Sequence, residues 1–297
     1  MLFTDSDPVS DDGLLGLVYE VCPRFVAGSV LHRSTTSFVV AGTLDLAPVV
    51  AKVLAGGSPF WRERFLREVE AYRLFEALPP PVPTPRMISA DPSRGVILLE
   101  RVFGRPLAYD RHPTASVPVP ELAGALTELR QLNKWQPPVG QSWIVNYAPR
   151  IDRARRQGIF DAADRAAVGE LTRRAAGRWE LAHGDLVLSN ILKTRDGFVF
   201  LDWATVGLYL AGFDLAQLWV LLGEVHGPRR VIEDMIGDAG PDALAPFLVN
   251  LALLLGRERR AYQHRTDEQG VARRALLTEA WGDVRERVHR AAAEPAG

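Results

Sequence analysis

The sequence is short of several features that would each indicate a particular class of protein. Cys22 is the single cysteine, so an internal disulfide is excluded. The 35 basic and 36 acidic residues are interleaved and nearly cancel, which argues against nucleic acid as a partner. The longest nearly uncharged stretch, residues 206–222, contains Asp214, so we expect no membrane partner. The first residues are acidic where a secretory signal would be basic and then apolar, so we expect a cytoplasmic protein.

Lysine is also scarce. It occurs only at Lys52, Lys134 and Lys193, so arginine is the usual cation of this chain. Lys52 stands out because it lies within the apolar run 49–54. The remaining composition is ordinary for a soluble globular protein, with 47% hydrophobic and 24% charged residues. A chain of 297 residues can form one large domain or two lobes.

From Gly28 to about Glu100 the sequence predicts strands with one helix. Ser58 and Pro59 supply an N-cap and a first helical position, and the helix continues over residues 60–78 to a run of three prolines. The β-branched runs on either side predict an antiparallel sheet. The predicted strands are residues 37–41, 48–54, 86–89 and 95–100.

From residue 105 onward the pattern is mainly helical. We expect helices at residues 120–135, 160–176 and 207–225 and over most of the chain to 290, with short strands around 190–192 and 198–201. The sequence therefore predicts an α+β protein of two lobes. Residues 1–100 form a small antiparallel β-sheet lobe with one helix, and a short crossover leads to a larger, mainly helical lobe, residues 105–297.

The most informative segment is residues 183–190, which reads His-Gly-Asp-Leu-Val-Leu-Ser-Asn, with Asp202 further on. Phosphoryl transfer needs a carboxylate near the acceptor hydroxyl and oxygen ligands that hold magnesium against the phosphates. Asp185, Asn190 and Asp202 match these needs. Each of the three alone is more simply explained as a turn or strand-end residue. Their joint spacing is that of the general kinase signature, which favours a kinase-type site.

This segment resembles the catalytic loop of the aminoglycoside phosphotransferase and choline kinase-like families, where His-Gly-Asp replaces the His-Arg-Asp of protein kinases. The resemblance implies a bilobal protein-kinase-like fold. It also implies an ATP- and Mg²⁺-dependent kinase that transfers the γ-phosphate to a hydroxyl group of a small-molecule acceptor. In that reaction Asp185 takes the acceptor proton, and Asn190 and Asp202 are the metal ligands.

By the same resemblance, Lys52 matches the lysine that contacts the α- and β-phosphates. Such a lysine needs a carboxylate from the following helix. At about 100° per residue, Glu68 falls on the apolar face of this helix, whereas Glu70 points away and Glu76 lies farther along. We therefore expect Glu68 to pair with Lys52. The apolar face comprises Trp61, Phe65, Val69 and Tyr72.

Residues 101–104 stand where this family has its interlobe hinge. The resemblance implies that the Glu100 carbonyl and the Val102 amide contact adenine, although a plain strand end is the alternative. Asp214 matches a helix aspartate that braces the catalytic loop through backbone hydrogen bonds, which is a structural role.

The loop that would cover the phosphates departs from the family pattern, because it contains no glycine. It consists of Ser34, Thr35, Thr36 and Ser37. Hydroxyl and backbone N–H groups could still bind phosphate oxygens, but an ordinary β-turn is an equal alternative.

Two absences argue against a protein kinase and for a small-molecule acceptor. Gly184 replaces the arginine that reads activation-loop phosphorylation, and only eleven residues separate Asp202 from Asp214.

A catalytically silent ATP-binding scaffold is the main alternative function, and an unrelated soluble α/β enzyme is the third hypothesis. The acceptor, the choice of ATP or GTP, a monomer or a homodimer, and a role in antibiotic resistance or in metabolism all stay open.

Overall fold

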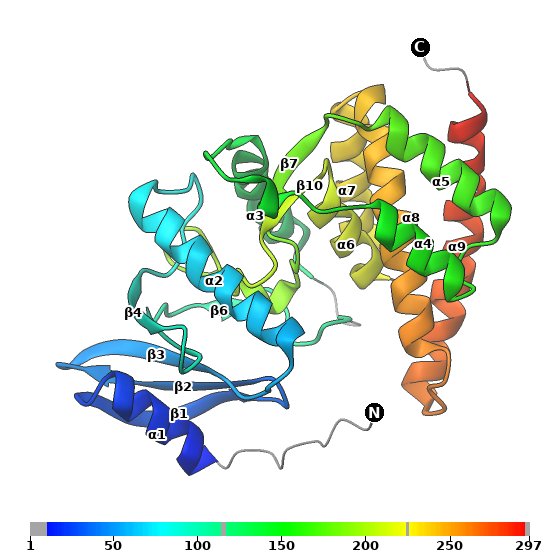
Figure 1. The fold of residues 1–297 in the computed structure, drawn as a ribbon. Coiled ribbons are helices and arrows are strands. Elements are labelled where there is room, and N and C mark those ends of the chain that lie inside the picture. The colour runs from blue at the N-terminus through cyan, green and yellow to red at the C-terminus, as the bar shows by residue number, and fades with distance from the viewer. Residues whose placement is uncertain (1–10, 114–116, 224–225, 295–297) are drawn as a thin grey trace. The chain divides into compact units, whose positions relative to one another are not determined.

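The computed structural model describes residues 11–113, 117–223 and 226–294. The chain forms two compact units, whose elements are labelled in Figure 1. Unit 1 comprises Met1–Gly104 and Val199–Val206, and unit 2 comprises Arg105–Phe198 and Gly207–Gly297. A short segment from late in the sequence therefore belongs to the N-terminal unit.

Unit 1 is built on a five-stranded antiparallel sheet of order β1-β2-β3-β5-β4. On β3, Val49, Ala51 and Val53 are buried in one apolar core. Because side chains alternate along a strand, Lys52 points to the opposite face. The predicted antiparallel sheet is confirmed. Its strands are β1 (Phe25–Arg33), β2 (Ser37–Leu44), β3 (Ala47–Leu54), β4 (Met87–Asp91) and β5 (Val96–Glu100).

Two helices accompany this sheet. Helix α2 (Pro59–Ala77) begins after Ser58 with a proline in its first turn, as the sequence predicts. Helix α1 (Asp11–Val21) was not predicted. It buries Leu14 and Val18 in the same core as β3, and the i, i+4 spacing of these two residues was the available signal.

The segment Val199–Val206 is fixed in unit 1 by Trp203, which is completely buried. Its ring meets that of Phe75 on α2 edge to face, with centroids 4.9 Å apart. Its Nε1 donates to the Phe200 carbonyl over 3.1 Å, and the Phe200 amide donates to the Pro83 carbonyl over 3.1 Å. These contacts set the position of the neighbouring Asp202.

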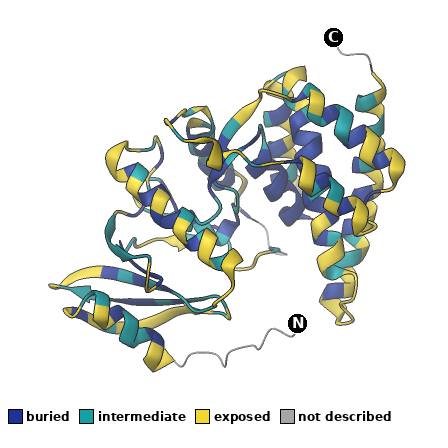
Figure 2. Ribbon diagram, viewed as in Figure 1, coloured by how far each residue is buried: buried dark blue, intermediate teal, exposed yellow. Residues whose placement is uncertain are grey.

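Unit 2 is mainly helical, as predicted. Helix α6 is its innermost element, since all ten of its residues are buried, and it appears dark blue in Figure 2. The helices are α3 (Val119–Lys134), α4 (Ala148–Arg156), α5 (Ala162–Arg174), α6 (Phe213–Leu222), α7 (His226–Asp238), α8 (Pro241–Tyr262) and α9 (Glu268–Ala293). None of the described helices is long and apolar enough to span a membrane.

Short strands complete the chain. In unit 2, β6 (Arg105–Pro106) pairs antiparallel with β8 (Ile191–Lys193), and β7 (Trp179–Ala182) pairs antiparallel with β10 (Gly207–Leu210). Strand β9 (Phe198–Phe200) leads into the segment that joins unit 1. The 3₁₀ turns are η1 (Gln141–Trp143) and η2 (Leu188–Asn190).

The predicted helix over residues 207–225 is wrong at its start. Gly207–Leu210 is strand β10, because pairing with β7 decides the structure of an apolar run that is ambiguous by itself. Gly212 then adopts a φ of 77° as the N-cap of α6. The predicted end, Val225, lies outside the described residues.

Gly42 on β2 is a position where the backbone approach requires glycine. A Cβ there would lie 2.3 Å from the Val26 carbonyl oxygen and 2.5 Å from the Phe25 ring. We expect Gly42→Ala to lower the free energy of unfolding by about 1–3 kcal/mol in urea denaturation. Gly16→Ala is the matched control. No atom lies within 4 Å of the added Cβ in α1, so it should raise stability by about 0.5–1 kcal/mol. Equal effects of the two substitutions would contradict this account.

Candidate active site

Lys52, Glu68 and Asp202 form an ionic cluster in unit 1. The Lys52 Nζ donates to Glu68 Oε2 over 2.7 Å and to Asp202 Oδ1 over 2.9 Å. The Glu68 side chain is only 1% exposed, whereas that of Asp202 is 44% exposed. The cluster therefore has one buried and one accessible carboxylate, bridged by a single ammonium.

The inward face of α2 explains why Glu68 is the partner. Glu68 is buried together with Phe65, Val69 and Tyr72, whereas Glu70 and Glu76 are exposed. Helical periodicity predicted that Glu68 pairs with Lys52, and this ion pair is present. A buried carboxylate on an apolar helix face needs a cation, and β3 supplies it.

Burial and charge act against each other on the pKa values of this cluster. Burial lowers the pKa of Lys52, but the carboxylates of Asp202 and Glu68 more than offset it, so the net shift is upward. Burial raises the pKa of Glu68 to about 7, although Lys52 acts in the opposite direction. The lysine is therefore charged at neutral pH.

Asp202 has an unusual backbone conformation. Its φ is 62°, and only Asp45 and Leu46 share a positive φ among the described non-glycine residues. Asp45 and Leu46 lie between β2 and β3, where a tight hairpin turn accounts for this conformation. Asp202 lies in no hairpin turn. A left-handed conformation at such a position is costly and marks a candidate functional residue.

In unit 2, Asp214 holds the loop that contains Asp185. The buried Asp214 carboxylate accepts from the His183 amide over 2.8 Å and from the Gly184 amide over 2.9 Å. Gly184 has a φ of 82°, which glycine adopts without steric cost. Burial raises the pKa of Asp214, and His183 and the two backbone bonds oppose the shift. This is the bracing geometry expected for Asp214.

Asp185 is held from two sides, yet its side chain remains 38% exposed. Its Oδ1 accepts from Gln217 Nε2 over 2.8 Å, and the Arg111 Nη1 lies 3.8 Å from the same oxygen. The Asn190 Nδ2 donates to the Asp185 main-chain carbonyl over 3.2 Å. The loop thus keeps Asp185 and Asn190 together, as the sequence spacing predicted.

Sequence reasoning missed Gln217 and Arg111. Gln217 lies three residues after Asp214 on α6, so both side chains leave the same helix face toward the loop. Its Oε1 also accepts from the Leu186 amide over 3.1 Å. That spacing could have identified Gln217. Arg111 lies in the loop after β6 and carried no pattern that could have identified it.

The loop over residues 34–37 is a hydroxyl-bonded turn. The Ser34 Oγ accepts from the amides of Ser37 over 3.0 Å and of Thr36 over 3.3 Å, and the Ser34 amide donates to the Ser37 carbonyl over 2.9 Å. Thr35 is exposed at its tip. Two of the amides that could cradle a phosphate are thus already bonded, which favours the ordinary turn among the two alternatives.

The residues expected to contact adenine lie at the end of unit 1. Glu100 is the last residue of β5, and its amide donates to the Arg86 carbonyl over 2.8 Å. Val102 follows two residues later, and the unit ends at Gly104.

The oxygen atoms of Asn190 and Asp202 fit a magnesium ion chemically. Asn190 uses its Nδ2 to bond the loop, so its other side-chain atom is an oxygen acceptor. Asp202 is accessible, and its Oδ1 accepts a hydrogen bond from Lys52. Within the described part of the chain, no group of three or more His, Cys, Asp or Glu side chains could hold a metal. Magnesium is often held by one or two protein oxygens together with substrate phosphates, and each of these side chains offers an oxygen of that kind.

A small antiparallel sheet with a lysine–glutamate pair, followed by a helical unit with a braced Asp-Asn loop, defines a protein-kinase-like fold. The phosphotransferase enzyme family model matches residues 32–247, and the chain belongs to that family. A search of curated protein sequences found no match.

Solved structures of aminoglycoside phosphotransferases share this fold at low sequence identity. APH(4)-Ia, in a ternary complex with ADP and hygromycin B, is 13% identical with a TM-score of 0.61, covering 95% of this chain and 99% of that one. An APH(2″) enzyme with GDP and kanamycin is 15% identical with a TM-score of 0.63, covering 91% and 98%. APH(2″)-IIa with streptomycin and ATP is 14% identical with a TM-score of 0.56, covering 92% and 99%.

The raised pKa of Glu68 predicts a pH dependence of stability. Glu68 keeps its proton up to about pH 7 in the folded state, against a usual value of 4.5, so the folded state binds more protons between these pH values. The free energy of unfolding should therefore fall as pH rises through this window. Urea denaturation at pH 5, 6 and 7 measures this fall. We expect the free energy of unfolding of the wild-type protein to fall by up to about 3 kcal/mol more than that of the Glu68→Gln variant. Parallel profiles for the two proteins would contradict it.

Proposed function

We propose that this chain is an ATP- and Mg²⁺-dependent kinase that phosphorylates a hydroxyl group of a small molecule. The proposal rests on the way in which the Asp185 carboxylate is held. It is fixed by Gln217 and by the braced loop, yet its carboxylate remains accessible. A general base needs this combination of a set orientation and access to the acceptor proton.

In the proposed reaction the acceptor oxygen forms a bond to the γ-phosphorus and the bond to the bridging oxygen of ATP breaks, releasing ADP. Asp185 orients the acceptor hydroxyl and takes its proton. Lys52, steadied by Glu68, binds the α- and β-phosphates. Asn190 and Asp202 would hold magnesium, which neutralises charge on the phosphates when bound. The side chains contribute alignment and charge rather than a covalent intermediate.

Asn190 and Asp202 must face the same phosphates in this proposal. Only β8, a short turn and β9 separate the two residues along the chain. The left-handed backbone at Asp202 also supports a functional role there.

The proposed hinge is residues 101–104, with the Glu100 carbonyl and the Val102 amide toward adenine. Ser34 to Ser37 are retained as a cover for the phosphates only through their hydroxyl groups, since Ser34 occupies two of the loop amides. The similar structures named above contain ADP, GDP or ATP and an aminoglycoside, which supports a nucleotide and a hydroxyl-bearing acceptor.

The alternative is an ATP-binding scaffold without catalysis. The glycine-free loop favours it, whereas the intact set of charged residues favours catalysis. Asp185→Asn distinguishes the two. We expect it to lower phosphate transfer at least about 100-fold while the thermal shift caused by Mg-ATP is retained. Asp196→Asn, in the exposed turn after β8, is the control and should keep wild-type activity. Nucleotide binding without transfer by the wild-type protein would favour the scaffold.

Gln217 is proposed as a positioning residue for Asp185. Gln217→Glu keeps the size and the acceptor for the Leu186 amide but replaces the donor to Asp185 by a like charge. We expect kcat to fall by about 10–100-fold while the KM for ATP does not change. Asn133→Asp, which also loses an amide donor bond within unit 2, controls for general destabilisation. A change in thermal stability with an unchanged kcat would contradict the positioning role.

A further inference from the structure

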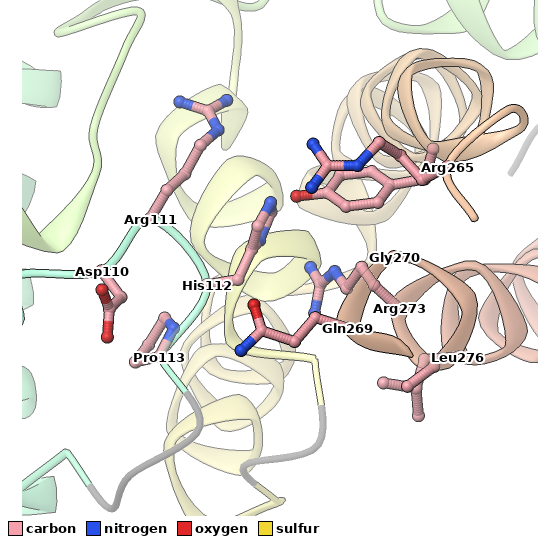
Figure 3. A pocket seen from close by; sticks show the side chains of 11 residues that line it. Asp110, Arg111, His112, Pro113, Arg265, Gln269, Gly270, Arg273 and Leu276 are labelled. Atoms are coloured by element: carbon pink, nitrogen blue, oxygen red, sulfur yellow. The ribbon is translucent and has the colours of Figure 1, made fainter. Parts of the chain in front are cut away.

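A pocket of about 400 Å³ lies in unit 2 between the loop after β6 and the start of α9 (Figure 3). Three arginines from separate segments line it: Arg111 from the loop, Arg265 from the α8–α9 connection and Arg273 from α9. Figure 3 shows the guanidinium groups of Arg265 and Arg273 pointing toward His112. Among the described lining residues, Asp110 is the single carboxylate.

Carboxylates outside the lining orient two of these arginines. Arg265 Nε donates to Asp267 Oδ2 over 2.7 Å, and Arg111 Nη2 lies 3.3 Å from Glu258 Oε1. A guanidinium carries five N–H donors in a fixed fork, so one such contact leaves further donors for a ligand. Asp267 also caps α9 by accepting from the Gly270 amide over 3.0 Å. The side chains, rather than the helix end, therefore supply the positive charge.

Arg273 is held by backbone carbonyls at the C-terminal end of α6. Its Nη2 donates to the Val220 carbonyl over 2.6 Å and to the Leu221 carbonyl over 3.4 Å. A cation is favourable at a helix C-terminus. Gly223 makes room for it, because a Cβ there would lie 2.2 Å from Arg273 Nη1. The backbone thus fixes this cation in the pocket wall.

His112 lies in the pocket wall and is uncharged there. Its ring packs edge to face against Tyr262, with centroids 5.5 Å apart. Burial lowers the pKa of His112 to about 4, and Arg273 and Arg111 lower it as well, whereas Glu258 acts in the opposite direction. The imidazole is therefore neutral at pH 7 and can donate a hydrogen bond without adding charge.

Arg111 connects this pocket to the candidate base. It lines the pocket, and its Nη1 lies 3.8 Å from Asp185 Oδ1. Arg111 is therefore shared by the pocket wall and the surroundings of Asp185 within unit 2.

We propose that this pocket binds an anionic group of the acceptor, a carboxylate or a phosphate, so that the substrate of the proposed kinase is an acidic alcohol. Arg265 and Arg273 hold the anionic group as guanidinium groups hold oxyanions elsewhere. A polycationic acceptor would place like charges against these arginines, which disfavours aminoglycosides for this chain. The inference rests on the proposed function and specifies its substrate class.

The first experiment compares acceptors in matched pairs by phosphorus NMR. Each pair shares one carbon skeleton: a hydroxy acid with its neutral alcohol, and a sugar phosphate with its free sugar. Amino alcohols and aminoglycosides complete the panel. We expect kcat/KM for the acidic member to exceed that of its neutral partner by at least about 10-fold. The better of the two acidic classes identifies the group as carboxylate or phosphate.

Arginine variants then test the pocket itself. Arg265→Gln and Arg273→Gln should raise the KM for the acidic acceptor by about 10-fold or more and leave the KM for ATP unchanged. Arg290→Gln, on α9 and paired with Glu286, is the matched control and should behave as wild type. Efficient transfer to neutral or cationic acceptors with none to acidic ones would overturn the inference and leave the proposed function standing.

A binding measurement keeps the test independent of turnover and of folding defects. Inorganic phosphate, compared with chloride at equal ionic strength, should raise the melting temperature of the wild-type protein. The rise should persist in Lys52→Met, which alters the candidate nucleotide site, and disappear in Arg265→Gln. A rise lost only in Lys52→Met would overturn the anion site. Phosphate binding at the pocket without transfer to any acceptor would overturn the proposed function and the acceptor assignment together.

Discussion

The ammonium of Lys52 joins three parts of unit 1 that lie far apart in the sequence. Glu68 is 16 residues away and Asp202 is 150 residues away, yet both carboxylates lie within 3 Å of one nitrogen. Without that cation, two carboxylates would face each other at a partly buried site. The contact acts together with Trp203, whose packing on Phe75 fixes the segment Val199–Val206 in this unit. The N-terminal unit is therefore completed by residues from the second half of the chain.

The charge balance of this cluster has a consequence for ligand binding. One ammonium faces two carboxylates, so the cluster carries an excess negative charge when both are ionised. Burial is the main cause of the raised pKa of Glu68, and the negative charge of Asp202 adds to it, whereas Lys52 acts in the opposite direction. A divalent cation held by the accessible Asp202 would compensate for it and release Lys52 for phosphate oxygens. The same cluster can thus serve the folded protein and the proposed kinase reaction.

The sequence predicted those features that depend on local spacing. Glu68 was identified because helix periodicity places it on a buried face. Asp185 and Asn190 were identified because their spacing is that of the kinase signature, which places both on one loop. Strand β10 was mistaken for helix because only its partner β7, far away in sequence, decides the structure of that apolar run. Arg111 was missed for the same reason, since its approach to Asp185 depends on a fold-level contact between residues 74 positions apart. Gln217 was within reach of the sequence, because it shares a helix face with Asp214.

Helix α6 connects the candidate base with the arginine-lined pocket of unit 2. Asp214 and Gln217, in its first half, position the loop of Asp185, and the carbonyls of Val220 and Leu221, near its end, hold Arg273. At 1.5 Å per residue, these two sets of anchor points lie about 10 Å or less apart along the axis. All ten residues of α6 are buried, so both sets of contacts lie on one packed element of unit 2. The acceptor that we propose would contact Asp185 and Arg273, and both of these residues are positioned by this one helix. Fold similarity alone does not specify an acceptor, because one fold can host many acceptors.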